Sequence, residues 1–268
     1  MENNQLNKFI KEILLLINNN DFINAELNTK KYLKKFPNSH ILNDLMGSIF
    51  INKKMFFESI EYYKKALNLD PNFVASILNM GVALQKLGRD TEAIFNFNTA
   101  LKKNSKLFTA YNNIGFILNR QGKYKEAVVN LKKAIKINPN FAESYLNLGI
   151  SFQNLEKNYE AIKTYKKALI LKENFYDVYF NLGEIYIKID KPKEALEHFL
   201  KSKNRKTNEK LLECLFLLNL KKEYTKLIET LDKKDPNNRG IASISAYISN
   251  QFNIPNSYNY CPHPLDFI

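Results

Sequence analysis

Five of the eight glycines in this chain recur at a constant spacing of 34 residues, and no other feature of the sequence limits the fold as strongly. They are Gly47, Gly81, Gly115, Gly149 and Gly183. A fixed period of this length is typical of proteins built from stacked supersecondary units, because one such unit cannot bury its apolar face alone. We therefore expect a stack of similar units along most of the chain.

Three further positions keep the same period. A small residue stands twelve positions after each glycine, a second small residue stands seven positions later, and a large residue lies between the two. The first small set is Ser59, Ala93, Ala127, Ala161 and Ala195; the second is Ala66, Ala100, Ala134, Ala168 and Ser202; the large set is Tyr63, Phe97, Leu131, Tyr165 and Phe199. Small residues at fixed positions indicate places where two elements approach closely.

Each unit contains two stretches with apolar residues at spacings of three and four, the pattern of an amphipathic helix. In the unit around Gly115 we expect helices over 108–120 and 125–137. We expect Gly115 and Ala127 to allow close packing within this helical hairpin, and Ala134 to allow packing against the following one. The predicted fold class is all-α.

This pattern resembles the tetratricopeptide repeat (TPR) family, in which helix pairs of 34 residues stack into a right-handed superhelical solenoid. The segment YLNLGISFQNLEKNYEAIKTYKKALIL, which begins at Tyr145, is close to the family consensus. The resemblance implies five repeat units over 40–207 and a degenerate unit or cap over 1–39, in which Ile13 replaces the glycine.

The period shifts after Thr207. Residues 208–252 are interpreted as a divergent helical pair followed by a capping helix. Residues 253–268 contain three prolines and no helical pattern, so an extended tail is expected there.

Composition is consistent with a folded protein in a reducing compartment. Hydrophobic residues make up 45% of the chain, enough to form a substantial core, and two cysteines are too few for a disulfide framework. The N-terminus lacks a signal-peptide pattern, and no apolar run is long enough to cross a bilayer. The expected location is cytoplasmic, without a membrane partner.

The chain is basic, with 40 lysines and arginines against 27 aspartates and glutamates. Nucleic acid, an acidic protein or an anionic membrane would suit this charge, and the alternative is a solvated lysine-rich surface. The solvated surface is favoured, because paired lysines recur late in the second helix of a unit and are predicted to lie outside the groove. These pairs are Lys64 and Lys65, Lys132 and Lys133, and Lys166 and Lys167. Nucleic acid is therefore not expected as a partner.

Asparagines recur two positions before four of the periodic glycines, on the first helix of each unit. Because first helices line the concave face of such a solenoid, these amides are predicted to form a ladder along a peptide-binding groove. The predicted groove residues are Asn79, Asn113, Asn147, Asn181, Asn112, Gln85, Asn119 and Gln153. The row resembles the asparagine ladder of O-linked N-acetylglucosamine transferases, which implies a grip on the backbone of an extended peptide. The alternative is that asparagine is simply common at this position.

A second binding mode of the family, a basic clamp for a C-terminal carboxylate, needs lysine or arginine at set positions of the first helices. The corresponding positions here are Asp44, Leu78, Asn112, Leu146 and Phe180. This departure from the family pattern argues against binding of chaperone tails. Apolar residues on the first helices are instead candidates for an apolar stripe beside the amides, with the alternative that some of them belong to the core: Leu78, Val82, Phe116, Leu146, Ile150 and Phe180.

No catalytic residues, cofactor site or metal site are predicted. The chain has three histidines, and Cys261 with His263 supplies only two of the ligands that zinc usually needs. No phosphate-binding loop or nucleophile elbow is present. We therefore predict a non-enzymatic scaffold that binds a protein or an extended peptide, with no prediction of its oligomeric state.

The last residues suggest an alternative. The segment from Ala242 to Ile268 resembles the linker of bacterial TPR proteins whose repeats precede a 2-oxoglutarate/Fe(II) oxygenase or a glycosyl- or sulfotransferase domain. The resemblance implies a substrate-recruiting arm of a truncated or split enzyme. The His-x-Asp…His iron ligands of such an oxygenase are absent from this sequence.

Overall fold

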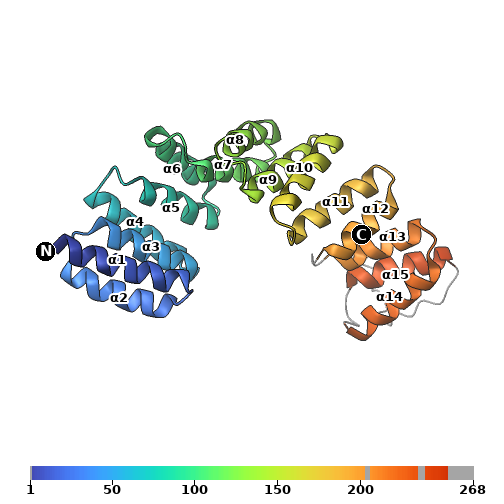
Figure 1. Cartoon of the computed structure of the whole chain (residues 1–268). Helices are drawn as coiled ribbons and strands as arrows, with labels where there is room; N and C mark the ends of the chain where they lie inside the picture. Colours follow the sequence, from blue (N-terminus) through green and yellow to red (C-terminus); the bar gives the residue numbers. More distant parts are fainter. Residues whose placement is uncertain (1, 203–205, 235–238, 253–268) are drawn as a thin grey trace. The chain divides into compact units, whose positions relative to one another are not determined.

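The computed structural model describes residues 2–202, 206–234 and 239–252, and these residues form fifteen helices and no strand (Figure 1). The all-α prediction is confirmed. The tail predicted for 253–268 lies outside the described residues. No helix in the described ranges combines the length and the apolar character that a bilayer crossing requires.

The chain divides into two compact units, Met1–Ser151 (unit 1) and Phe152–Ile268 (unit 2), which are described separately. The division falls within one helix, α9 (Ala142–Asn154). Unit 1 contains the hairpins α1–α2, α3–α4, α5–α6 and α7–α8 before it. Their bounds are α1 Glu2–Asn18, α2 Phe22–Lys35, α3 His40–Asn52, α4 Phe56–Leu69, α5 Val74–Lys86, α6 Asp90–Lys103, α7 Phe108–Arg120 and α8 Tyr124–Ile137.

Unit 2 continues with α10, two further helical pairs and a final helix. The bounds are α10 Asn158–Leu171, α11 Tyr176–Lys188, α12 Pro192–Lys201, α13 Thr207–Leu217, α14 Lys221–Lys234 and α15 Arg239–Phe252. The last three helices share one apolar cluster, in which Leu212, Tyr224 and Ile248 are buried. This shared core explains how helices that no longer follow the 34-residue period still pack together.

The periodic glycines receive the large residue of the second helix. A Cβ atom built on Gly115 would lie 2.5 Å from Cγ of Leu131, closer than real Cβ atoms approach any neighbour. The sequence predicts that the two helices approach closely at Gly115 and Ala127. In the structure Leu131 packs against the glycine, and Ala127 is buried as well. The same arrangement joins Gly47 to Tyr63, Gly81 to Phe97 and Gly183 to Phe199.

The turn between the two helices of a hairpin also repeats. Six residues spaced by 34 positions have φ between 57° and 75°: Asn20, Lys54, Gly88, Gly122, Glu156 and Asp190. At Gly88 the N–H of the next residue, Arg89, donates to the carbonyl of Leu84, and the Gly88 N–H donates to Gln85, which is a Schellman motif. Since a left-handed residue with a Cβ is strained, the four non-glycine turns carry a conformational cost.

Polar contacts join the first helices of neighbouring hairpins at every second interface of unit 1. Between α3 and α5, Oδ1 of Asp44 accepts from the hydroxyl of Ser76 at 2.8 Å and from the amide of Asn79 at 3.4 Å. The interface of α5 with α7 has no such group, because Leu78 takes the place of Asp44.

The polar arrangement returns between α7 and α9. Oδ1 of Asn112 accepts from Ser144 and from the amide of Asn147, both at 3.1 Å. All three side chains are buried. The 34-residue repeat therefore carries a 68-residue alternation in how neighbouring hairpins bond.

Replacement of Lys54 by glycine is expected to stabilise unit 1. Lys54 is exposed and left-handed, so the substitution relieves backbone strain without loss of packing, and Gly88→Ala, where nothing lies near the added Cβ, should do the reverse. We expect changes of about 1 kcal/mol in opposite directions, measured by chemical denaturation. Equal signs for the two variants would contradict the strain argument.

Asp44→Asn is expected to stabilise the protein at neutral pH. Burial raises the pKa of Asp44, against the opposing hydrogen bonds from Ser76 and Asn79, so the folded state holds the proton more tightly than the unfolded chain does. The penalty for the ionised carboxyl is absent below the ordinary pKa of aspartate and grows as pH rises through the raised value. Asparagine keeps the acceptor and removes the charge, as Asn112 does in the equivalent network.

The gain at pH 7 should be on the order of 1 kcal/mol and should disappear toward acid pH. Denaturant unfolding at several pH values measures it. Asn112→Asp is the matched control and should lose stability at pH 7. A gain from Asp44→Asn that did not depend on pH would contradict burial of the charge as its cause.

Candidate functional site

The predicted amide row of unit 1 lies on three first helices, with Asn79 on α5, Asn113 on α7 and Asn147 on α9. The three amides occupy equivalent positions of successive units, but the structure gives them different surroundings. Asn147 is buried, whereas Asn79 and Asn113 are half-buried. The row is therefore not a set of equivalent open amides.

Three of the predicted groove residues, Asn112, Asn119 and Asn147, hold the helices of unit 1 together. The Asn147 amide donates to Asn112, as described above, and the amide of Asn119 on α7 donates to the backbone carbonyl of Asn147 at 2.8 Å. Oδ1 of Asn119 accepts from the hydroxyl of Ser151 at 2.7 Å. Because these side chains already bond to a neighbouring helix, a ligand would have to compete for them.

Asn113 differs from Asn147 because the residue 35 positions before it is Leu78, which offers no acceptor. Its Oδ1 accepts from the adjacent Asn112 at 3.5 Å, and within the described residues no acceptor is recorded for its own amide N–H groups. The Oδ1 atom of Asn79 likewise has no recorded donor there, since only its amide nitrogen is used. The Asn79 amide oxygen on α5 and the Asn113 amide nitrogen on α7 therefore remain available as an acceptor and a donor.

Apolar side chains lie beside these amides. Phe116 follows Asn113 by one helical turn and is 42% exposed, and the guanidinium of Arg120 lies 5.9 Å from the centre of its ring. On α5 Val82 is equivalent to Phe116 and Gln85 is equivalent to Asn119, and both are half-buried. We call the surface formed by Leu78, Asn79, Val82, Gln85, Asn113 and Phe116 the first-helix face.

In unit 2 the predicted site residues contribute mainly to packing. The buried hydroxyl of Tyr165 donates to Oε1 of Gln153 at 2.8 Å and is hydrogen-bonded to the Asn181 side chain, while burial raises the pKa of Tyr165. Phe180, a candidate for the apolar stripe, is buried with its ring 5.6 Å from that of Phe199. The stripe prediction is therefore wrong at Phe180, because its ring packs against the large residue of the next helix.

The histidine and cysteine side chains of the described residues lie in apolar surroundings or apart from one another. No group of three histidine, cysteine, aspartate or glutamate side chains is placed there to bind a metal ion. Cys214 is buried, and desolvation raises the pKa of its thiol to about 12, so the thiolate that reacts is not formed at neutral pH. His198 packs edge-on against Tyr179 and Tyr186, and desolvation lowers its pKa. The pair Cys261 and His263 lies outside the described ranges.

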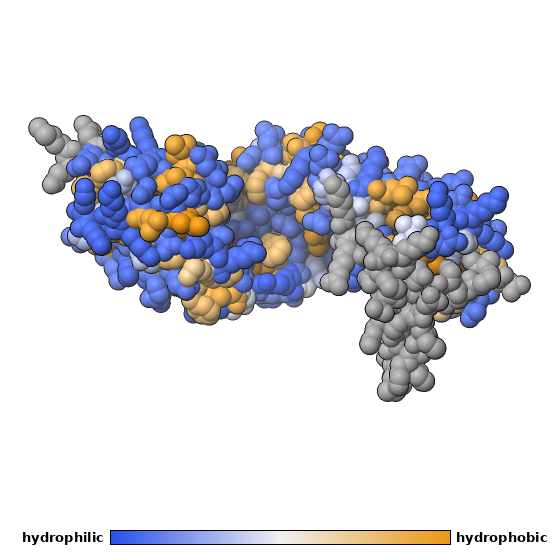
Figure 2. Space-filling model, turned by 90° about the horizontal axis from the view of Figure 1, so that it is seen from below, coloured by the Kyte–Doolittle hydropathy of each residue, from blue (hydrophilic) through white to orange (hydrophobic). Residues whose placement is uncertain are grey.

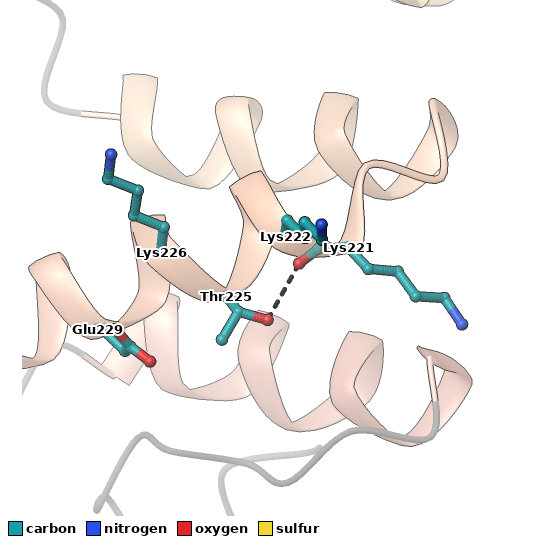
Figure 3. Close-up of a pocket in the computed structure, with 5 residues that line it drawn as sticks. All are labelled: Lys221, Lys222, Thr225, Lys226 and Glu229. Carbon is teal, nitrogen blue, oxygen red and sulfur yellow. Dashed lines mark hydrogen bonds between the residues drawn. The ribbon is translucent and has the colours of Figure 1, made fainter.

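The exposed surface offers further hollows. The face seen in Figure 2 is largely hydrophilic, with hydrophobic side chains in separate patches. One hollow lies along α14 and is lined by Lys221, Lys222, Thr225, Lys226 and Glu229. Figure 3 shows that all five side chains come from a single helix, where the Thr225 hydroxyl donates to the Lys221 carbonyl. A hollow with only one helix as its wall cannot enclose a ligand.

Family models match most of the periodic region. A model described as TPR repeat matches residues 117–156, and models described as tetratricopeptide repeat match 62–95 and also 42–73, 142–175 and 176–208. No curated protein sequence matches the chain. None of these matches shows the fusion to an oxygenase or transferase domain that the C-terminal resemblance implied.

Solved structures share the fold. The structure from a study of Pseudomonas aeruginosa pilF is 18% identical, covers 78% of this chain and 97% of that chain, and has a TM-score of 0.68. MamA from Desulfovibrio magneticus RS-1 is 26% identical, with coverage of 60% and 92% and a TM-score of 0.55. YrrB, titled a TPR protein with an unusual peptide-binding site, is 20% identical, with coverage of 72% and 97% and a TM-score of 0.54.

The repeat matches together span residues 42–95 and 117–208, more than half of the 268 residues, and they coincide with the hairpins in which a large side chain packs on a glycine. This chain therefore belongs to the tetratricopeptide repeat family.

Proposed function

We propose that the protein is a scaffold whose concave, amide-lined groove binds an extended segment of another protein, with the first-helix face of unit 1 as the centre of that groove. The observation that carries this proposal is the uncommitted amide of Asn113, which lies one turn from the exposed ring of Phe116. An amide group beside an apolar surface suits a peptide, which presents backbone polar groups and side chains together.

The geometry of the amides supports an extended ligand. A peptide backbone offers both N–H and C=O groups, and the face supplies a matching donor from Asn113 and an acceptor from Asn79. These contacts are to backbone atoms, so they impose little sequence preference. Val82 and Phe116 would then select for apolar side chains in the bound segment.

A protein ligand is favoured over nucleic acid by the positions of the lysines. Lys64, Lys65, Lys132 and Lys133 are exposed on the second helices α4 and α8, whereas the first-helix face carries amides and apolar groups. Binding at this face should therefore depend weakly on salt, because counterion release from phosphates would be absent. The peptide-binding site named for YrrB, a protein of similar fold, is consistent with the proposal.

A peptide array against the purified full chain identifies ligands, and fluorescence anisotropy then measures the affinity of the best one. Asn113→Ala is expected to weaken binding about fivefold to tenfold, the value of one or two hydrogen bonds, without a change in stability. Asn147→Ala should instead lower the free energy of unfolding by about 1–3 kcal/mol, because it removes one of the two buried hydrogen bonds to Asn112 and leaves a space where the amide was.

Asn68→Ala, on the exposed side of α4, is the control and should change neither property. Unchanged affinity of the Asn113→Ala variant, in a protein of normal stability, would remove Asn113 from the site. A steep loss of affinity with salt would point to a charged ligand surface elsewhere.

A further inference from the structure

A second surface of unit 1, formed mainly by the second helices α6 and α8, combines apolar and positively charged groups. Two adjoining hollows of about 550 Å³ and 440 Å³ meet at Tyr111 and Lys133, which line both. The first runs between α6 and α8, and the second lies between α8 and the turn before α7. Unlike the hollow on α14, each is therefore walled by more than one element.

The apolar part of this surface is exposed without a structural reason. Phe95 on α6 is 70% exposed at the first hollow, and Ile137 at the end of α8 is 37% exposed at the second. The equivalent positions of the other units carry Leu27, Glu61, Val129, Lys163 and Glu197, so packing of the repeat does not require an aromatic ring there. A large exposed ring at a multi-walled hollow marks a contact site.

The polar part is positive. The two hollows are lined by four lysines, Lys102, Lys106, Lys133 and Lys136, and by no aspartate or glutamate. No ion pair is recorded for any of the four within the described part of the chain. Lys106 is also specific to this unit, because the equivalent position is asparagine in the others.

We propose that the surface formed by Phe95, Tyr111, Ile137 and these four lysines, the Tyr111 surface, binds an acidic segment of a partner protein that carries an aromatic or large apolar side chain. The apolar side chain would lie between Phe95 and Tyr111, and flanking carboxylates would pair with the lysines on either side. Charge complementarity decides the class of partner, because four unopposed ammonium groups attract carboxylates and repel basic segments.

Single-stranded nucleic acid fits this surface less well. Nucleic acid bases are held by a series of aromatic rings along the strand, whereas the ring at this surface that is more than half exposed is Phe95, and the Lys133 ammonium lies 5.5 Å from the centre of the Tyr111 ring. The Tyr111 surface is separate from the first-helix face, and this inference does not depend on the function proposed above.

The test uses the full chain and a fluorescent peptide library in which an aromatic residue is flanked by aspartates and glutamates. Binding by at least one such peptide is expected, and replacement of its aromatic residue by alanine should weaken binding about tenfold. The double variant Lys106→Glu with Lys136→Glu should weaken it about tenfold or more, and Phe95→Ala about fivefold.

Matched controls separate the site from general charge and hydrophobicity. Lys11→Glu with Lys31→Glu changes the net charge equally on exposed positions of α1 and α2, and Phe57→Ala removes an equally exposed ring on α4. Both controls should leave the affinity unchanged, as should Asn113→Ala, which tests the other face.

Three outcomes would overturn the proposal: no binding by any acidic peptide of the library, equal losses in the control variants, or tighter binding of an oligonucleotide of matched charge that is lost in the same variants. Circular dichroism of each variant verifies that the fold is intact. Since all the substituted side chains except half-buried Asn113 are exposed, unfolding is not expected to obscure the result.

Discussion

The packing of a large second-helix side chain onto a first-helix glycine is the contact on which each regular hairpin depends. At Gly47, Gly81, Gly115 and Gly183 the space of the missing Cβ is filled by a ring or a leucine from the partner helix. These large side chains are completely buried. In these four hairpins any residue other than glycine would push the two helices apart, so the repeated spacing of these glycines reflects one steric requirement.

The contacts between hairpins are less uniform than those within them. Asp44 and Asn112 each accept from a serine and an asparagine of the next first helix, whereas Leu78 between them accepts nothing. Asn79 and Asn147 each donate to an acceptor 35 positions earlier, as buried polar groups normally do. Because leucine has no acceptor atom, Asn113 lacks this partner. The same residue type at the same repeat position therefore has a structural role in one unit and is available to a ligand in the next.

This difference shows how much of the structure could be predicted from the sequence. Residues 108–120 were predicted as a helix and form α7, because the apolar pattern and the turn residues define a hairpin locally. The small residues Gly115 and Ala127 predict where the two helices approach. The sequence does not show that the Leu131 side chain fills the space at the glycine. The distinct surroundings of Asn113 and Asn147 depend on residues 35 positions earlier, a relation that exists only after the hairpins stack. A search of the sequence for an acceptor residue 35 positions before each asparagine could have found that relation.

The Tyr111 surface was missed because the residues that distinguish it, Phe95 and Lys106, do not repeat. A search for periodicity selects the positions that packing holds constant, and Phe95 and Lys106 stand at positions where the other units carry polar or different residues. In a repeat protein the periodic residues maintain the solenoid, and substitutions among them are limited by burial. Exposed positions are free of that limit, so an aromatic ring or a cluster of lysines found there in one unit alone is not explained by folding. Specific recognition by such a chain is therefore best sought where one unit departs from its neighbours at the surface.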